Sequence, residues 1–171
     1  MNSKIFTKTW EEESNEDTME GLYLTFSLDN RDYAFEVRYL VEIVALPPIT
    51  TIPGTASFLK GVINLRGKVI PALDVRLRFQ MESMDYHDRT CALVVQLEDL
   101  IIALIVDKVN EVIRIPKDHI DPAPKIGDSE ASRFIIATGR VGDDVKILVD
   151  LTKLLSDEES HAVRQTGALG T

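Results

Sequence analysis

The sequence has a single cysteine and no long apolar run, and each of these absences excludes a class of protein. Cys91 has no second cysteine to pair with, and its apolar surroundings predict that it packs as a small hydrophobic residue. No stretch approaches the roughly 20 apolar residues that cross a bilayer, and the N-terminus lacks a secretory leader. The composition therefore favours a cytoplasmic protein that is not inserted in a membrane.

Basic residues are also scarce, with 19 Lys and Arg against 28 Asp and Glu and a formal net charge of −9. Without a basic stripe to displace counterions from phosphates, binding to nucleic acid is not expected. His87, His119 and His161 lie far apart and lack metal-ligand spacing. No phosphate-binding glycine motif is present. We expect no catalytic residue, no metal site and no cofactor.

What the sequence does contain is a series of short β-rich runs separated by Gly, Pro, Asn and Asp. Period-two alternation and β-branched residues predict strands, and the intervening residues predict turns. The predicted strands cover residues 22–28, 33–37, 42–46, 61–65, 68–73, 91–97, 100–106, 111–115, 137–141 and 145–149.

The second half of this series repeats the first. A shift of 69 residues aligns like residues over the first three strands, and a shift of 76 aligns the remainder after a loop insertion. Matching positions include Glu42 and Glu111, Pro47 and Pro116, Phe58 and Phe134, and Asp74 and Asp150. Repeats of this kind predict an all-β protein with two five-stranded barrels, each only marginally stable alone and therefore packed together through an apolar junction. Short helices are expected at element ends and at the C-terminus, with the two aspartates as helix caps.

The repeats give the expected domain organisation. Residues 1–20 are polar and acidic and predict a mobile arm, in which Trp10 is either idle or a docking residue. The folded unit spans 21–155, with a first repeat at about 21–80 and a second at about 89–155. Whether the last strands are exchanged between barrels is left open. Residues 156–171 form a C-terminal tail that we expect to be mobile after Ser160.

Three features are not explained by packing alone. The turn Asn64-Leu65-Arg66-Gly67 has no counterpart in the second copy, and Arg66 is either a solvated turn residue or the partner of Glu42. Leu40, Ile43, Val109 and Val112 fall beside the expected junction, where they either form core or line a groove for an apolar helix. Val62, Ile63, Val69 and Ile70 lie in strands whose edges could accept a partner.

Residues 58–71, followed by Asp74-Val75-Arg76, strongly resemble the signature of the CheW family of bacterial chemotaxis coupling proteins. The likeness runs from about residue 22 to 155. It implies two SH3-like barrels and a cytoplasmic, non-catalytic adaptor, recruited to membrane-attached arrays, that couples methyl-accepting chemoreceptors to the histidine kinase CheA. A similar adaptor of a non-chemotactic pathway, such as pilus motility, is the alternative.

The resemblance also implies binding residues. The receptor tip, a helical hairpin, would bind between the barrels, with Glu42 and Arg66 as a coupling pair. The residues implied for this contact are Leu40, Glu42, Ile43, Gly61, Asn64, Leu65, Arg66, Gly67, Val109 and Val112. The regulatory domain of the kinase would make a barrel-end contact, for which Val62, Val69 and Ile70 are guesses. Weak self-association in rings is left open.

Overall fold

Strands dominate the computed structural model, which describes residues 4–7, 19–123, 130–156, 158–161 and 163–164. They are β1 (Lys4–Thr7), β2 (Leu22–Leu28), β3 (Arg31–Glu36), β4 (Leu40–Ala45), β5 (Ile49–Thr50), β6 (Leu59–Leu65), β7 (Lys68–Asp74), β8 (Cys91–Leu97), β9 (Leu100–Val106), β10 (Lys108–Arg114), β11 (Ile120–Pro122), β12 (Ile135–Val141) and β13 (Asp144–Val149). The helical elements are short: η2 (Val37–Tyr39), α2 (Val75–Arg78), η3 (Lys117–His119), η4 (Glu130–Arg133) and η5 (Leu151–Lys153). The predicted β class is confirmed, and all ten predicted strands are present.

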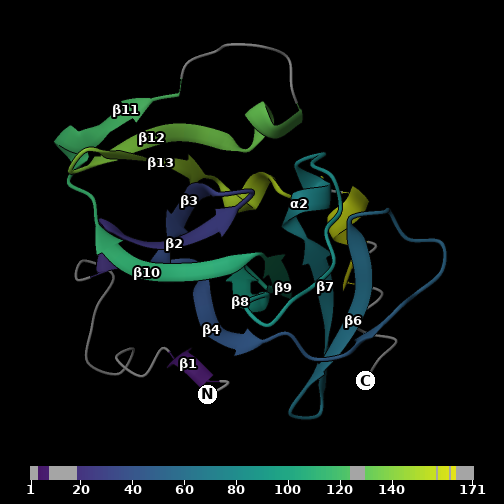
Figure 1. Ribbon diagram of the computed structural model, residues 1–171. Helices are drawn as coiled ribbons and strands as arrows, with labels where there is room; N and C mark the ends of the chain where they lie inside the picture. Colours follow the sequence, from purple (N-terminus) through teal and green to yellow (C-terminus); the bar gives the residue numbers. More distant parts are fainter. Residues whose placement is uncertain (1–3, 8–18, 124–129, 157, 162, 165–171) are drawn as a thin grey trace.

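The strands form two sheets, each of which draws on both sequence repeats (Figure 1). One has the order β1-β4-β8-β9-β7-β6-β5, and we call it the β4 barrel. The other has the order β10-β2-β3-β13-β12-β11, and we call it the β10 barrel. The repeats are joined by two parallel pairs, β7 with β9 and β13 with β3, and by two antiparallel pairs, β4 with β8 and β10 with β2. Each barrel therefore combines the opening hairpin of one repeat with later strands of the other.

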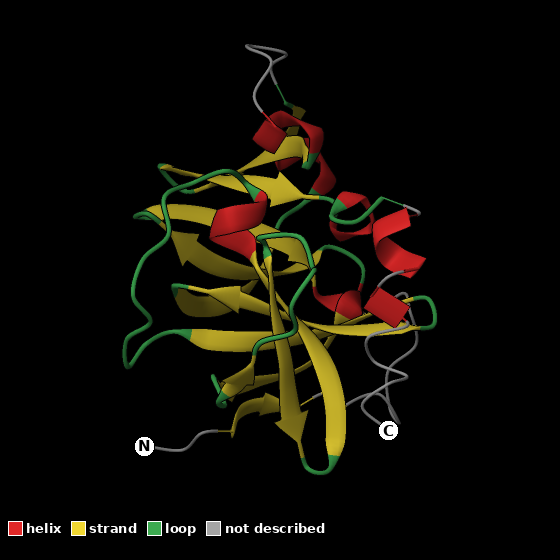
Figure 2. Cartoon of the chain, turned by 90° about the vertical axis from the view of Figure 1, so that its right-hand side faces the viewer, coloured by secondary structure: helices red, strands yellow, loops and turns green. Residues whose placement is uncertain are grey.

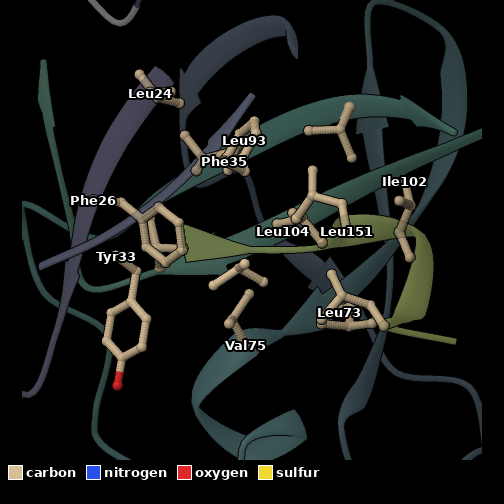
Figure 3. Packing of buried hydrophobic residues seen from close by; sticks show 14 of the residues in the cluster. Leu24, Phe26, Tyr33, Phe35, Leu73, Val75, Leu93, Ile102, Leu104 and Leu151 are labelled. Atoms are coloured by element: carbon tan, nitrogen blue, oxygen red, sulfur yellow. The ribbon is translucent and has the colours of Figure 1, made fainter. Parts of the chain in front are cut away.

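The main hydrophobic core lies between the barrels, so the expected apolar junction is confirmed. Figure 3 shows side chains from both barrels meeting there, among them Phe26 and Phe35 from one barrel and Leu93 and Leu104 from the other. Smaller clusters fill the interiors of the barrels, around Ile63 and Ile105 in the β4 barrel and around Ile115 and Leu148 in the β10 barrel.

The two repeats make the same local contacts where they turn from strand to helix. Asp74 donates its backbone N–H to the carbonyl of Phe58, and Asp150 donates its own to that of Phe134, both at 2.8 Å. Each aspartate also accepts a backbone hydrogen bond through its side chain, Asp74 from α2 and Asp150 from η5. The predicted caps are therefore present. Because the two caps occur at equivalent positions, they hold short helical turns of both repeats against the shared core.

Arg78, at the end of α2, connects the repeats through its buried guanidinium. It lies 4.5 Å from the ring centroid of Phe58 and 4.8 Å from that of Phe134, which are matching residues of the two repeats. Its Nε donates to the carbonyl of Leu154 at 2.6 Å, and Nη2 lies 3.4 Å from Glu159 Oε1. One side chain thus holds the C-terminal segment against both aromatic rings.

The two ends of the chain differ from the sequence expectation. Residues 4–7, expected to belong to a mobile arm, form β1, which pairs antiparallel with β4. A free edge on the apolar β4 would expose unpaired backbone groups, and β1 satisfies part of that edge. Beyond Ser160, Val163 is buried in the main core and Arg164 pairs with Asp99 at 2.8 Å, so this part of the tail packs against the barrels (Figure 2). Trp10 lies outside the described residues.

Candidate functional site

The turn between β6 and β7 has a conformation that its sequence specifies. Arg66 and Gly67 have φ values of 51° and 86°, the left-handed pair that a tight hairpin turn requires. The Asn64 side chain accepts a hydrogen bond from the Gly67 N–H at 2.9 Å, which fixes the turn. The result is a rigid turn that presents Arg66 at the end of the β4 barrel.

Arg66 pairs with Glu42, which answers the question that the sequence left open. Arg66 Nη1 donates to Glu42 Oε2 at 3.2 Å, and Nη2 donates to Oε1. The pairing with Glu42 raises the pKa of Arg66, because hydrogen bonds to the carboxylate favour the charged guanidinium. The two side chains differ in exposure, at 5% for Glu42 and 66% for Arg66. A nearly buried carboxylate is thus neutralised by a cation that a partner could also contact.

Two of the apolar residues implied for the receptor contact have no accessible side chain. Leu40 and Ile43 are buried within the core between the barrels. Val109 and Val112, on β10, are half-buried and pack against the same core. An irregularity in β4 between Leu40 and Glu42 lets both Leu40 and Ile43 face the other barrel, although they are three residues apart, whereas β10 is an edge strand of its sheet. Of these four apolar residues, only the two valines are accessible to a bound helix in this conformation.

Gly61 serves packing and offers no side chain for binding. Its φ is 142°, and a Cβ atom added there would lie 2.0 Å from the Thr50 carbonyl oxygen. Glycine is therefore required for β5 to approach β6. Gly67, by contrast, has open space around its Cα and is exposed, as is Asn64, while Leu65 is half-buried against the interior of the β4 barrel.

The residues guessed for the kinase lie on the β6–β7 hairpin. Val62 pairs with Pro71 and Val69 pairs with Asn64 in the antiparallel register, and both valines are half-buried. Ile70 is buried in the interior of the β4 barrel, so it supports the hairpin rather than its outer surface.

The sequence analysis missed an ion pair that joins the repeats. Arg76 Nη1 lies 2.7 Å from Asp107 Oδ2, and their side chains are only 10% and 15% exposed. Arg76 also donates to the Glu82 carbonyl at 3.0 Å, which anchors the linker between the repeats. The sequence did contain a sign of this ion pair, because Arg76 lies between apolar residues of α2 and a buried arginine usually requires a partner.

No group of histidine, cysteine and acidic residues that could hold a metal ion occurs among the residues that the structure describes. Within the same residues, no helix combines the length and apolarity needed to span a bilayer.

Comparisons with known proteins agree with this geometry. A family model described as CheW-like domain matches residues 22–159. The chemotaxis protein CheW of Klebsiella aerogenes is 33% identical over 141 residues, covering 82% of this chain and 85% of that protein. The CheW of Helicobacter pylori is 29% identical over 147 residues, covering 86% and 87%. The crystal structure of the scaffolding protein TtCheW from Thermoanaerobacter tengcongensis superposes with a TM-score of 0.74 at 30% identity, covering 81% of this chain and 96% of that one.

Proposed function

The chain belongs to the CheW family of chemotaxis scaffold proteins, and from that premise we propose that it couples chemoreceptors to the histidine kinase CheA. It would act without catalysis, in the cytoplasm, at arrays of membrane-attached receptors. The names of the relatives favour chemotaxis over the pilus-motility pathway considered from the sequence.

The observation that carries this proposal is the pairing of Glu42 with Arg66. A mostly exposed arginine held by a nearly buried carboxylate is preorganised, because its side chain is already ordered before a partner arrives. Receptor tips are helical, and a helix could lie with its polar groups on Arg66 and Asn64 and its apolar groups on Val109 and Val112. Leu40, Ile43 and Gly61 would then act through packing, by holding β4 and β6 in place.

The kinase contact is proposed on the outer surface of the β6–β7 hairpin, with Val62 and Val69 as its accessible apolar side chains. Ile70 would support this surface from the interior of the barrel. This arrangement leaves Arg66 at the junction of the two contacts, since it occupies the turn of the same hairpin.

The test is a capture experiment with a receptor cytoplasmic fragment and a kinase regulatory domain, separately and together. We expect wild type to capture both and Arg66→Glu to lose receptor capture, because a second carboxylate then faces Glu42. Arg140→Glu is the matched control, since Arg140 is an exposed arginine of the equivalent hairpin, paired with Asp121 at 3.0 Å.

Circular dichroism of both variants shows whether the barrels persist. Equal receptor capture by Arg66→Glu and wild type would refute the assigned site. Failure of wild type to capture either partner would refute the coupling function itself.

A further inference from the structure

The strand β10 contains a bulge at the place where the proposed receptor contact lies. Val109 pairs with Phe26, and Val112 pairs with Leu24. Three steps along β10 therefore match two steps along β2, so one extra residue of β10 is accommodated opposite Thr25. In a regular strand, two positions three residues apart would point to opposite faces. The bulge explains why Val109 and Val112 pack against the same core.

A buried hydroxyl, that of Thr25, anchors this bulge. Its Oγ1 donates to the Glu111 carbonyl at 2.8 Å and accepts from the Glu111 N–H at 3.1 Å. Thr25 is only 1% exposed, so water cannot replace these bonds unless β10 separates from β2. On the exposed side, the Asn110 amide donates to Ser27 Oγ at 3.0 Å. Thr25 is thus the buried anchor of a strand whose one pairing partner, among the described residues, is β2.

The first repeat has no such anchor. The shift of 69 residues matches Thr25 with Val94 and Glu111 with Glu42. The strand β4 is also irregular between Leu40 and Glu42, but there Glu42 pairs directly with Val94 in the strand register. A valine side chain is therefore accommodated beside the irregular strand of the first repeat. In the second repeat, the threonine hydroxyl takes the place of part of the backbone ladder.

The two bulges leave their apolar pairs in different environments. Leu40 and Ile43 of β4 are buried, whereas the matching Val109 and Val112 of β10 are half-buried. The accessible pair is the one whose bulge is anchored by a hydroxyl. Bulges beside functional sites commonly serve to aim side chains, and this bulge aims two.

We propose that Thr25 is a positioning residue, whose hydroxyl holds the β10 bulge and thereby aligns Val109 and Val112 for the receptor helix. This inference rests on the proposed function. Being buried, Thr25 would touch no partner itself and would act through β10. Loss of its hydroxyl leaves the N–H and carbonyl of Glu111 without their partner, so the bulge is no longer fixed. A helix that docks on both valines requires both to be in place at once.

The test uses Thr25→Val, which removes the hydroxyl, keeps the shape of the side chain and supplies the residue that the first repeat has here. Titration with a receptor cytoplasmic fragment, followed by calorimetry, measures the affinity. We expect it to fall by about tenfold, as for the loss of one well-placed apolar contact. Thr25→Ser retains a hydroxyl and should restore the affinity to within about twofold of wild type.

Thr90→Val is the matched control. Thr90 is also buried, and its Oγ1 accepts from the His87 N–H at 3.0 Å, but it lies in the linker before β8. This variant should be less stable than wild type and yet bind the receptor fragment equally well. Unchanged affinity in a folded Thr25→Val, or an equal loss of affinity in Thr90→Val, would overturn the inference.

Amide hydrogen exchange, followed by nuclear magnetic resonance, tests the anchor without a receptor. The Glu111 amide should exchange about tenfold faster in Thr25→Val than in wild type, and at the wild-type rate in Thr25→Ser. An unchanged rate in Thr25→Val would overturn the inference.

Wild type provides a measurement that does not depend on the folding of any variant. The Glu111 amide has no partner in the strand register, yet the bond to Thr25 should protect it as well as the ladder amides of β2 are protected. Exchange at the rate of an open amide would overturn the inference. If wild type binds no receptor fragment, the proposed function fails, and exchange at Glu111 then decides by itself whether Thr25 holds the bulge.

Discussion

Arg78 offers the most direct test of how the two repeats are held together, because one buried side chain contacts both. Replacement by alanine removes a charge-assisted hydrogen bond to Leu154 of about 1.5–3 kcal/mol. It also removes two cation–π contacts, at 4.5 and 4.8 Å, of about 0.5–2 kcal/mol each. Relaxation of the side chains around the vacated space offsets part of this loss in stability. We therefore expect Arg78→Ala to lower the free energy of unfolding by about 3–5 kcal/mol, somewhat below the upper end of the summed contributions.

Urea unfolding followed by far-ultraviolet circular dichroism measures this loss. With a slope of about 2 kcal/mol per molar urea for a chain of this size, the midpoint should fall by roughly 1.5–2.5 M. Arg38→Ala is the matched control, because Arg38 lies 4.7 Å from the ring of Tyr39 and pairs with Glu36 in an exposed position. Its loss should stay below about 1 kcal/mol. Equal midpoints for the two variants would refute the idea that Arg78 joins the repeats.

Three further predictions concern single positions. Gly61→Ala should lower the free energy of unfolding, measured in urea, by roughly 3 kcal/mol or more, because the added Cβ meets the Thr50 carbonyl. Gly67→Ala adds only backbone strain and should lower it by about 1–2 kcal/mol. Equal losses for the two variants would contradict this prediction. Burial raises the pKa of Cys91 to about 12, so a thiol reagent at pH 8 should label it only after unfolding, and rapid labelling of the native protein would count against the structure. The hydrogen bond from Lys146 lowers the pKa of Asp32 below its unfolded value, so this carboxylate stabilises the fold above about pH 4, and the benefit is lost as pH falls through the folded pKa. Lys146→Met should therefore be less stable than wild type at pH 7 and approach it in acid, and a constant difference would argue against the ion pair.

The strands were predictable because most of them carry their own apolar pattern and turn residues. The strand β2 was predicted with its observed bounds, as were β8 and β9. By contrast, β1, β5 and β11 are two to four residues long and depend on an adjacent strand for their pairing, so no local pattern marks them. The sequence repeat also could not reveal which strands pair across repeats, because that depends on long-range contacts between β7 and β9 and between β13 and β3.

The candidate site was predictable in part. The turn chemistry of Asn64 and Gly67 and the charge of Arg66 are visible in the sequence, and so is the chance that Glu42 is its partner. The burial of Leu40 and Ile43 could not be predicted from the sequence, because an apolar residue near a junction can face either the core or a groove. Likewise, the ion pair of Arg76 with Asp107 joins residues 31 positions apart, which only the fold brings together.

The mixed composition of the barrels also affects how the chain can fold during synthesis. When residue 80 leaves the ribosome, β2 and β3 have no β10 or β13 to pair with, and β4, β6 and β7 lack β8 and β9. The β4 barrel cannot be completed before β9, and the β10 barrel cannot be completed before β13. The first repeat must therefore remain incompletely folded, with apolar strands exposed, until well into synthesis of the second. Each repeat on its own lacks essential strands of both barrels, so neither repeat can fold as a separate unit.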